Sequence, residues 1–67
     1  MTVTEFISLA NNNEIDFTIN DIFGTDYGTC KKDYIKYLES KAKDREISSY
    51  TIDKYDDGTP YIRIWVK

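Results

Sequence analysis

The stretch DFTINDIFGTDYGT (residues 16–29) decides the fold, because the way its first strand-like pattern ends determines what the rest of the chain can form. Phe17 and Ile19 alternate with polar neighbours, and Ile15 precedes them in the same phase. Strict alternation is typical of a strand with one buried face. We therefore expect a short strand over about residues 15–18.

The residues that follow carry a helix start signal. Thr18 stands three positions before Asp21, a spacing typical of the first turn of a helix. A short helix is expected over about residues 19–23, with Ile22 and Phe23 on its buried side.

A longer helix is expected over about residues 29–43. Two glycines within residues 24–28 predict a turn before it. When positions are placed about 100° apart, Tyr34 and Leu38 fall on one side of this helix and several lysines fall on the other. The apolar side is expected to face the core.

The N-terminal residues predict a further helix over about residues 3–11. Thr2 and Glu5 form a capping-box pattern, and apolar residues then recur at helical spacing. Three consecutive asparagines, residues 11–13, are expected to end this helix.

The C-terminal residues predict a β-hairpin with strands at about residues 48–55 and 60–66. The Asp57-Gly58 dipeptide is a strong hairpin signal. A three-residue loop with Gly58 in the left-handed conformation sorts the faces best, since it pairs Ile52 with Ile62 and Tyr50 with Ile64.

This order of elements, with the stretch at residues 16–29 and the DDGTPY hairpin turn, resembles small phage-associated winged helix-turn-helix domains of unassigned function. The resemblance implies an α+β winged-helix fold that occupies residues 1–67 as one domain. It also implies a DNA-binding regulatory protein of phage or mobile-element type, with the third helix as recognition helix.

Composition narrows the classes of function. The 67 residues include no histidine and one cysteine, and the formal net charge is −3. We expect no enzyme, no metal site and no cofactor, because zinc-type ligand sets and common nucleophilic motifs are missing. A cytoplasmic protein without a membrane segment is expected, since neither a signal sequence nor a span of about 20 apolar residues occurs.

Double-stranded DNA is the partner that the resemblance implies. The net negative charge argues against phosphate binding, but local clusters of lysine matter more than the total. The candidate contacts lie on or beside the expected third helix: Thr29, Lys31, Lys32, Lys36 and Lys43. The alternative is that these lysines only keep a core helix hydrated.

A second hypothesis is a protein-binding module, such as a phage-encoded inhibitor of a host protein, which docks through the hairpin without binding DNA. Its surface would combine aromatic and charged residues of types that are common at binding hot spots: Tyr55, Asp56, Asp57, Tyr61, Arg63 and Trp65. Trp65 could instead pack on the first helix, and a homodimer that buries this surface would serve both arguments.

Three weaker readings stay open. Asp53, Asp56 and Asp57 could hold a cation, although turn formation explains such residues as well. Cys30 could be reactive at a helix start or could simply pack in the core. The last strand could also pair edge to edge with a partner.

Overall fold

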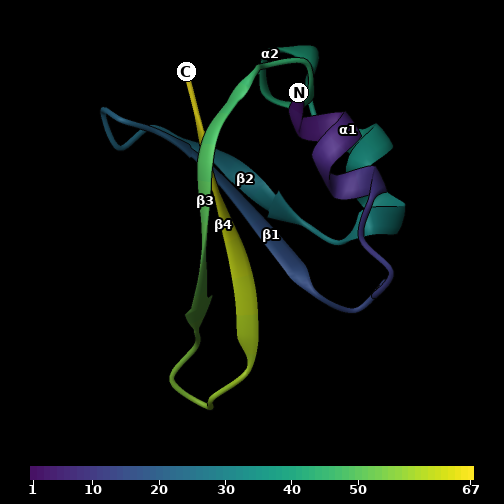
Figure 1. Cartoon of the computed structure of the whole chain (residues 1–67), viewed down its shortest axis with the longest axis vertical. Helices are drawn as coiled ribbons and strands as arrows, with labels where there is room; N and C mark the ends of the chain where they lie inside the picture. Colours follow the sequence, from purple (N-terminus) through teal and green to yellow (C-terminus); the bar gives the residue numbers. More distant parts are fainter.

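The structure, a computed structural model that describes residues 1–67, is a small α+β domain built on one four-stranded mixed sheet (Figure 1). The strand order is β2-β1-β4-β3, in which β1 and β4 pair in parallel and each outer strand is antiparallel to its neighbour. In chain order the elements are α1 (Val3–Ser8), β1 (Asp16–Asp21), β2 (Asp26–Cys30), the 3₁₀ helix η1 (Lys32–Tyr37), α2 (Ser40–Lys43), β3 (Ile47–Lys54) and β4 (Pro60–Val66).

The expected helix at residues 19–23 is wrong, because β1 continues through those positions to Asp21. Ile19 pairs with Ile64 of β4, and the two following residues pair with the two that follow Ile64. The Thr18 hydroxyl lies 3.2 Å from the Thr29 hydroxyl of β2 and caps no helix. Pairing with a distant strand therefore overrides the local helix signal.

The expected helix at residues 29–43 is also wrong. Its first residues belong to β2, and the rest forms η1 and α2, with extended backbone at Lys31 and again at Leu38 and Glu39. With these breaks in place, Cys30, Ile35 and Leu38 all pack against the same core cluster.

The winged helix-turn-helix architecture is therefore corrected to a sheet with short helices on one side. No helix exceeds six residues, and the central strands belong to the sheet and not to a peripheral wing. A recognition helix of the expected length does not exist in this chain.

Helix α1 begins as the sequence predicts but is shorter than expected. The capping box is present: the Glu5 amide donates to the Thr2 hydroxyl, and the Thr2 amide donates to the Glu5 carboxylate. The helix ends at Ser8 and not near residue 11. Its buried residues, Val3 and Ile7, face the sheet core.

The hairpin register is confirmed. Ile52 pairs with Ile62 and Tyr50 with Ile64, and Gly58 has a φ of +87°, the left-handed conformation that glycine adopts without strain. The Tyr55 amide donates to the Thr59 carbonyl at 2.9 Å and closes the loop.

The core lies between the helices and one face of the sheet. Six buried residues form it: Val3, Ile7, Phe17, Ile19, Ile64 and Val66. Ile35 of η1 and Leu38 pack against the same cluster. In Figure 1 all three helices gather beside the sheet on one side, while the far end of the β3–β4 hairpin extends beyond them. The opposite sheet face, called the open face below, has no helix against it.

Candidate functional site

Side chains of the two central strands line the open face. Because successive side chains of a strand point to opposite faces, the residues that alternate with the buried ones project here. From β1 these are Asp16, Thr18 and Asn20, and from β4 they are Tyr61, Arg63 and Trp65. The face therefore combines aromatic, cationic and hydrogen-bonding groups.

The three β4 residues and Tyr55, which directly follows β3, form a continuous stack, called the aromatic ladder: Tyr55, Tyr61, Arg63 and Trp65. The Tyr55 and Tyr61 rings stack with centroids 4.5 Å apart and an interplanar angle of 22°. The Arg63 guanidinium lies 5.7 Å from the ring centroids of both Tyr61 and Trp65, and it donates to the Tyr61 hydroxyl at 2.8 Å. Such contacts fix the orientation of side chains that would otherwise rotate freely.

Two carboxylates anchor the ladder. Asp16 accepts hydrogen bonds from Lys31 Nζ at 2.5 Å and from the Tyr55 hydroxyl at 2.8 Å. The bond from Lys31, and then the bond from Tyr55, lower the pKa of Asp16, while the same contact to Asp16 raises the pKa of Tyr55. Asp53 lies 3.7 Å from Arg63 Nε. Each cation on this face is thus matched by a carboxylate.

Two polar atoms on the open face are buried without a hydrogen-bond partner, Asn20 Oδ1 and Arg63 Nε, and no other side-chain atom of the protein shares this state. Asn20 is the register partner of Trp65 on the neighbouring strand.

The residues of the predicted protein-binding surface separate into two groups. The aromatic ladder lies together on the sheet, and half-buried Trp65 belongs to the open face and does not pack on α1. Asp56 and Asp57 lie at the tip of the hairpin turn, beyond the strands. There the Asp57 carboxylate accepts from the Thr59 amide at 2.9 Å, which lowers the pKa of Asp57 and shapes the turn.

The predicted DNA contacts are spread over several elements of the structure. They occupy the end of β2, the link to η1, η1 itself and α2: Thr29, Lys31, Lys32, Lys36 and Lys43. Thr29 and Lys31 line one hollow, where β2 meets η1, and Lys36 and Lys43 line another, beside α1.

The two lysines of η1, Lys32 and Lys36, both contact other groups of the protein. Lys32 Nζ donates to the Ala10 carbonyl at 2.6 Å, just past the end of α1. Lys36 Nζ lies 5.3 Å from the ring centroid of Tyr37. The Lys32 contact ties the start of η1 to the segment after α1, whereas the Lys36 contact lies within η1.

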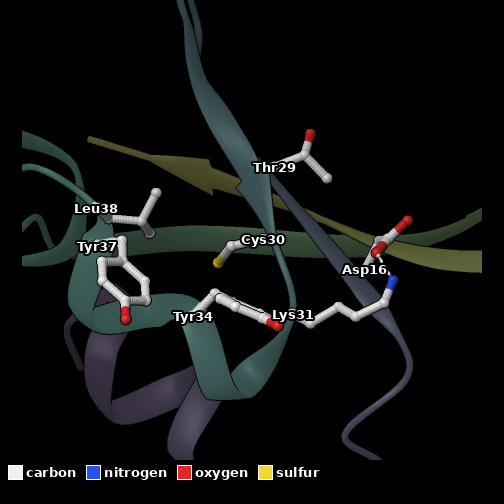
Figure 2. A pocket seen from close by; sticks show the side chains of 7 residues that line it. All are labelled: Asp16, Thr29, Cys30, Lys31, Tyr34, Tyr37 and Leu38. Carbon is white, nitrogen blue, oxygen red and sulfur yellow. Dashed lines mark hydrogen bonds and ion pairs between the residues drawn. The ribbon is translucent and has the colours of Figure 1, made fainter.

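A shallow hollow of about 460 Å³ opens where β2 meets η1 (Figure 2), and it is lined by Asp16, Thr29, Cys30, Lys31, Tyr34, Tyr37 and Leu38. In Figure 2 the Cys30 sulfur points toward the tyrosines, while Thr29 points away from them. Burial, and then the charge of Asp16, raise the pKa of Cys30, so the less reactive thiol form is favoured. Cys30 is the last residue of strand β2 and does not lie at the start of a helix. The helix dipole that could have made its thiol reactive is therefore absent.

The sequence reasoning missed an exposed apolar turn between β1 and β2, called the β1–β2 turn. Ile22 and Phe23, which were expected to be buried, are 74% and 86% exposed. The sequence carries no local signal for it, because the apolar alternation of Phe17 and Ile19 stops at the polar Asp21, and β1 reaches that residue through its pairing with β4.

Asp21 organises that turn from a buried position. Its carboxylate accepts from the amides of Phe23 and Thr25 at 2.9 and 3.0 Å and from the Tyr27 hydroxyl at 3.0 Å. Burial alone would raise the pKa of Asp21, but the hydrogen bonds together outweigh it and lower the pKa. The turn is thus a fixed support for two exposed apolar side chains.

Comparison with known protein families, with curated proteins and with solved structures gave no match. None of the helices has the length and apolar content needed to cross a bilayer.

Proposed function

We propose that this protein is a protein-binding module that receives its partner on the open face. The observation that carries the proposal is the aromatic ladder, a stacked row of Tyr, Arg and Trp side chains on a sheet face that no helix covers. These three residue types dominate binding hot spots, since they offer large contact area together with polar tips.

Pre-organisation of the ladder supports the same proposal. Tyr55 is held by Asp16, and Arg63 is held between two rings and a hydroxyl. Side chains that are already ordered lose little conformational entropy when a partner binds. The rigid β1–β2 turn adds Phe23 at the end of the sheet where Trp65 lies, since Asn20 is both the register partner of Trp65 and close to the turn in sequence.

Charge favours a protein over a nucleic acid as the partner. The cations Lys31 and Arg63 are matched by Asp16 and Asp53, and the whole chain carries a formal charge of −3. Phosphate backbones attract surfaces with an excess of Lys and Arg. A protein surface with basic and apolar groups fits this face better.

DNA binding stays a prediction without a recognition helix to carry it. A mobility-shift titration of mixed-sequence duplex DNA at low salt tests it. If the protein retards the duplex, and if Lys36→Ala abolishes this shift while Arg63→Ala does not, DNA binding would replace the present proposal.

To test the proposal, a partner is first captured from lysate and identified. It is then purified, and its affinity for the protein is measured. Arg63→Ala and Trp65→Ala should each weaken binding to that purified partner by at least 30-fold, the factor that corresponds to a hot spot of about 2 kcal/mol. Tyr34→Ala is the matched control, because Tyr34 is an exposed aromatic residue of η1, away from the ladder. The proposal would be overturned if the wild type, the two ladder variants and the Tyr34→Ala control all bound the purified partner with equal affinity.

A further inference from the structure

We propose that two copies of this chain form a dimer in which their β3 strands pair antiparallel, edge to edge. β3 is an outer strand of the sheet and pairs only with β4 (Figure 1). It spans eight residues, contains no proline and carries one lysine, at its last position. Natural edge strands are usually shielded by proline, bulges or several charges, and residues 49–54 have little of this protection.

The free edge of β3 has backbone groups ready for a second strand. The Tyr55 amide bonds to Thr59, so in an antiparallel ladder Asp53 and Thr51 also direct their N–H and C=O groups toward β4. The intervening residues, Tyr50 and Ile52, therefore direct theirs away from the sheet. Another strand in antiparallel orientation satisfies these groups.

The side chains of the same two residues form an exposed apolar strip on the helix-bearing face. Tyr50, Ile52 and Leu9 of the segment after α1 are 53%, 66% and 68% exposed. They border a hollow of about 290 Å³ whose lining is entirely apolar: Phe6, Leu9, Ala10, Phe17, Tyr50, Ile52 and Ile62. The domain thus leaves apolar surface uncovered directly beside its unpaired edge.

One register suits both the backbone and the side chains, with a two-fold axis at Thr51. It places Tyr50 of each copy opposite Ile52 of the other, as hydrogen-bonded pairs on the apolar face. Asp53 then faces Ser49, so no like charges meet across the strands, although the chain is acidic. An axis at Ile52 would set Tyr50 against Lys54, which separates the two apolar side chains.

A second copy fits the β3 edge better than it fits the β2 edge on the other side of the sheet. β2 has five residues, includes Gly28 and pairs with β1 through an irregular register. Two β3 edges related by a two-fold axis satisfy each other completely. The joined sheet would have eight strands, four from each copy, and would carry two aromatic ladders on one continuous open face.

Disulfide trapping tests the register. In a Cys30→Ser background, Thr51→Cys should give a covalent dimer under mild oxidation, because directly opposed residues of a non-hydrogen-bonded pair have Cα atoms about 4.5 Å apart, within disulfide range. The matched controls are Ser49→Cys and Asp53→Cys. Each should crosslink poorly with itself, and a mixture of the two should crosslink well.

Sedimentation of the uncrosslinked protein tests the dimer independently. Wild type should sediment as a dimer, and Ile52→Lys should shift it to a monomer with an unchanged far-UV spectrum, since Ile52 is mostly exposed in the single chain. Wild type that is monomeric at the highest soluble concentration would overturn the proposal. So would equal crosslinking through Ser49→Cys alone and Thr51→Cys alone. Neither result would affect the binding test of the aromatic ladder.

Discussion

Two phenylalanines six positions apart provide the sharpest test of this fold. Phe17 is 1% exposed at the centre of the core, whereas Phe23 is 86% exposed in the β1–β2 turn. The same substitution, Phe to Ala, should therefore have very different effects on the free energy of unfolding at the two positions. In a chain with a helix at residues 19–23, both rings would be buried and both substitutions would be costly.

The expected magnitudes follow from burial. Truncation of a buried phenylalanine to alanine costs about 3–5 kcal/mol. A domain of 67 residues has a total stability of roughly 3–10 kcal/mol, so Phe17→Ala should remove a large share of it. Full burial of a large apolar side chain is worth roughly 1.5–3 kcal/mol. Phe23 has only about one seventh of its surface buried, so Phe23→Ala should cost about 0.2–0.4 kcal/mol.

Urea denaturation followed by the fluorescence of Trp65, the single tryptophan, measures both values. Phe17→Leu is the fallback where Phe17→Ala is unfolded without urea, and it should still lower the midpoint clearly. A loss above about 1.5 kcal/mol for Phe23→Ala, at the lower bound for a fully buried ring, would refute the sheet topology at residues 19–23. An unchanged midpoint for Phe17→Ala would refute the assignment of the core.

Three further measurements probe the backbone, the helix cap and the titrating groups, and a fourth probes the thiol. Gly58→Ala should cost about 1–2 kcal/mol because the φ of +87° is unfavourable for residues with a Cβ, and Gly58→Asn should cost less in the same urea titration. Thr2→Ala should cost about 1 kcal/mol through loss of the capping hydrogen bond, with Thr4→Ala as a comparison for the loss of a side-chain hydroxyl. The pKa of Asp16 in the folded protein is below its ordinary value of 3.8, so its stabilising effect is complete above that pH and is lost as the pH falls further; Asp16→Asn should flatten the decline of the urea midpoint below about pH 4. Cys30 should react with a thiol reagent at pH 8 more slowly in the folded protein than in urea, because burial raises its pKa, and equal rates would contradict this.

Local signals predicted the parts of the fold that local contacts determine. The Thr2–Glu5 capping box and the register of the β3–β4 hairpin are both present as expected. Each depends on residues close in sequence whose geometry is set by hydrogen bonds within one turn or one loop.

The errors arose where a distant strand decides the structure. Residues 19–21 have a helix start signal, yet they pair with Ile64–Val66 at the centre of the sheet. No pattern within the window of residues 16–29 contains that information. The sequence did place Tyr61, Arg63 and Trp65 on one face, because alternation along a single strand is enough for that. The contacts of Asp16 with Lys31 and Tyr55 depend on the tertiary arrangement and were not foreseen.

The parallel contact between β1 and β4 has a consequence for how the chain reaches its native state. Asp16 and Tyr61, which are register partners, are 45 positions apart, so the middle of the sheet forms only after a long loop has closed. During synthesis β1 leaves the ribosome well before β4, with Phe17 and Ile19 unshielded in the interval. This is the period in which a nascent chain of this topology is most exposed to non-native association and to chaperones.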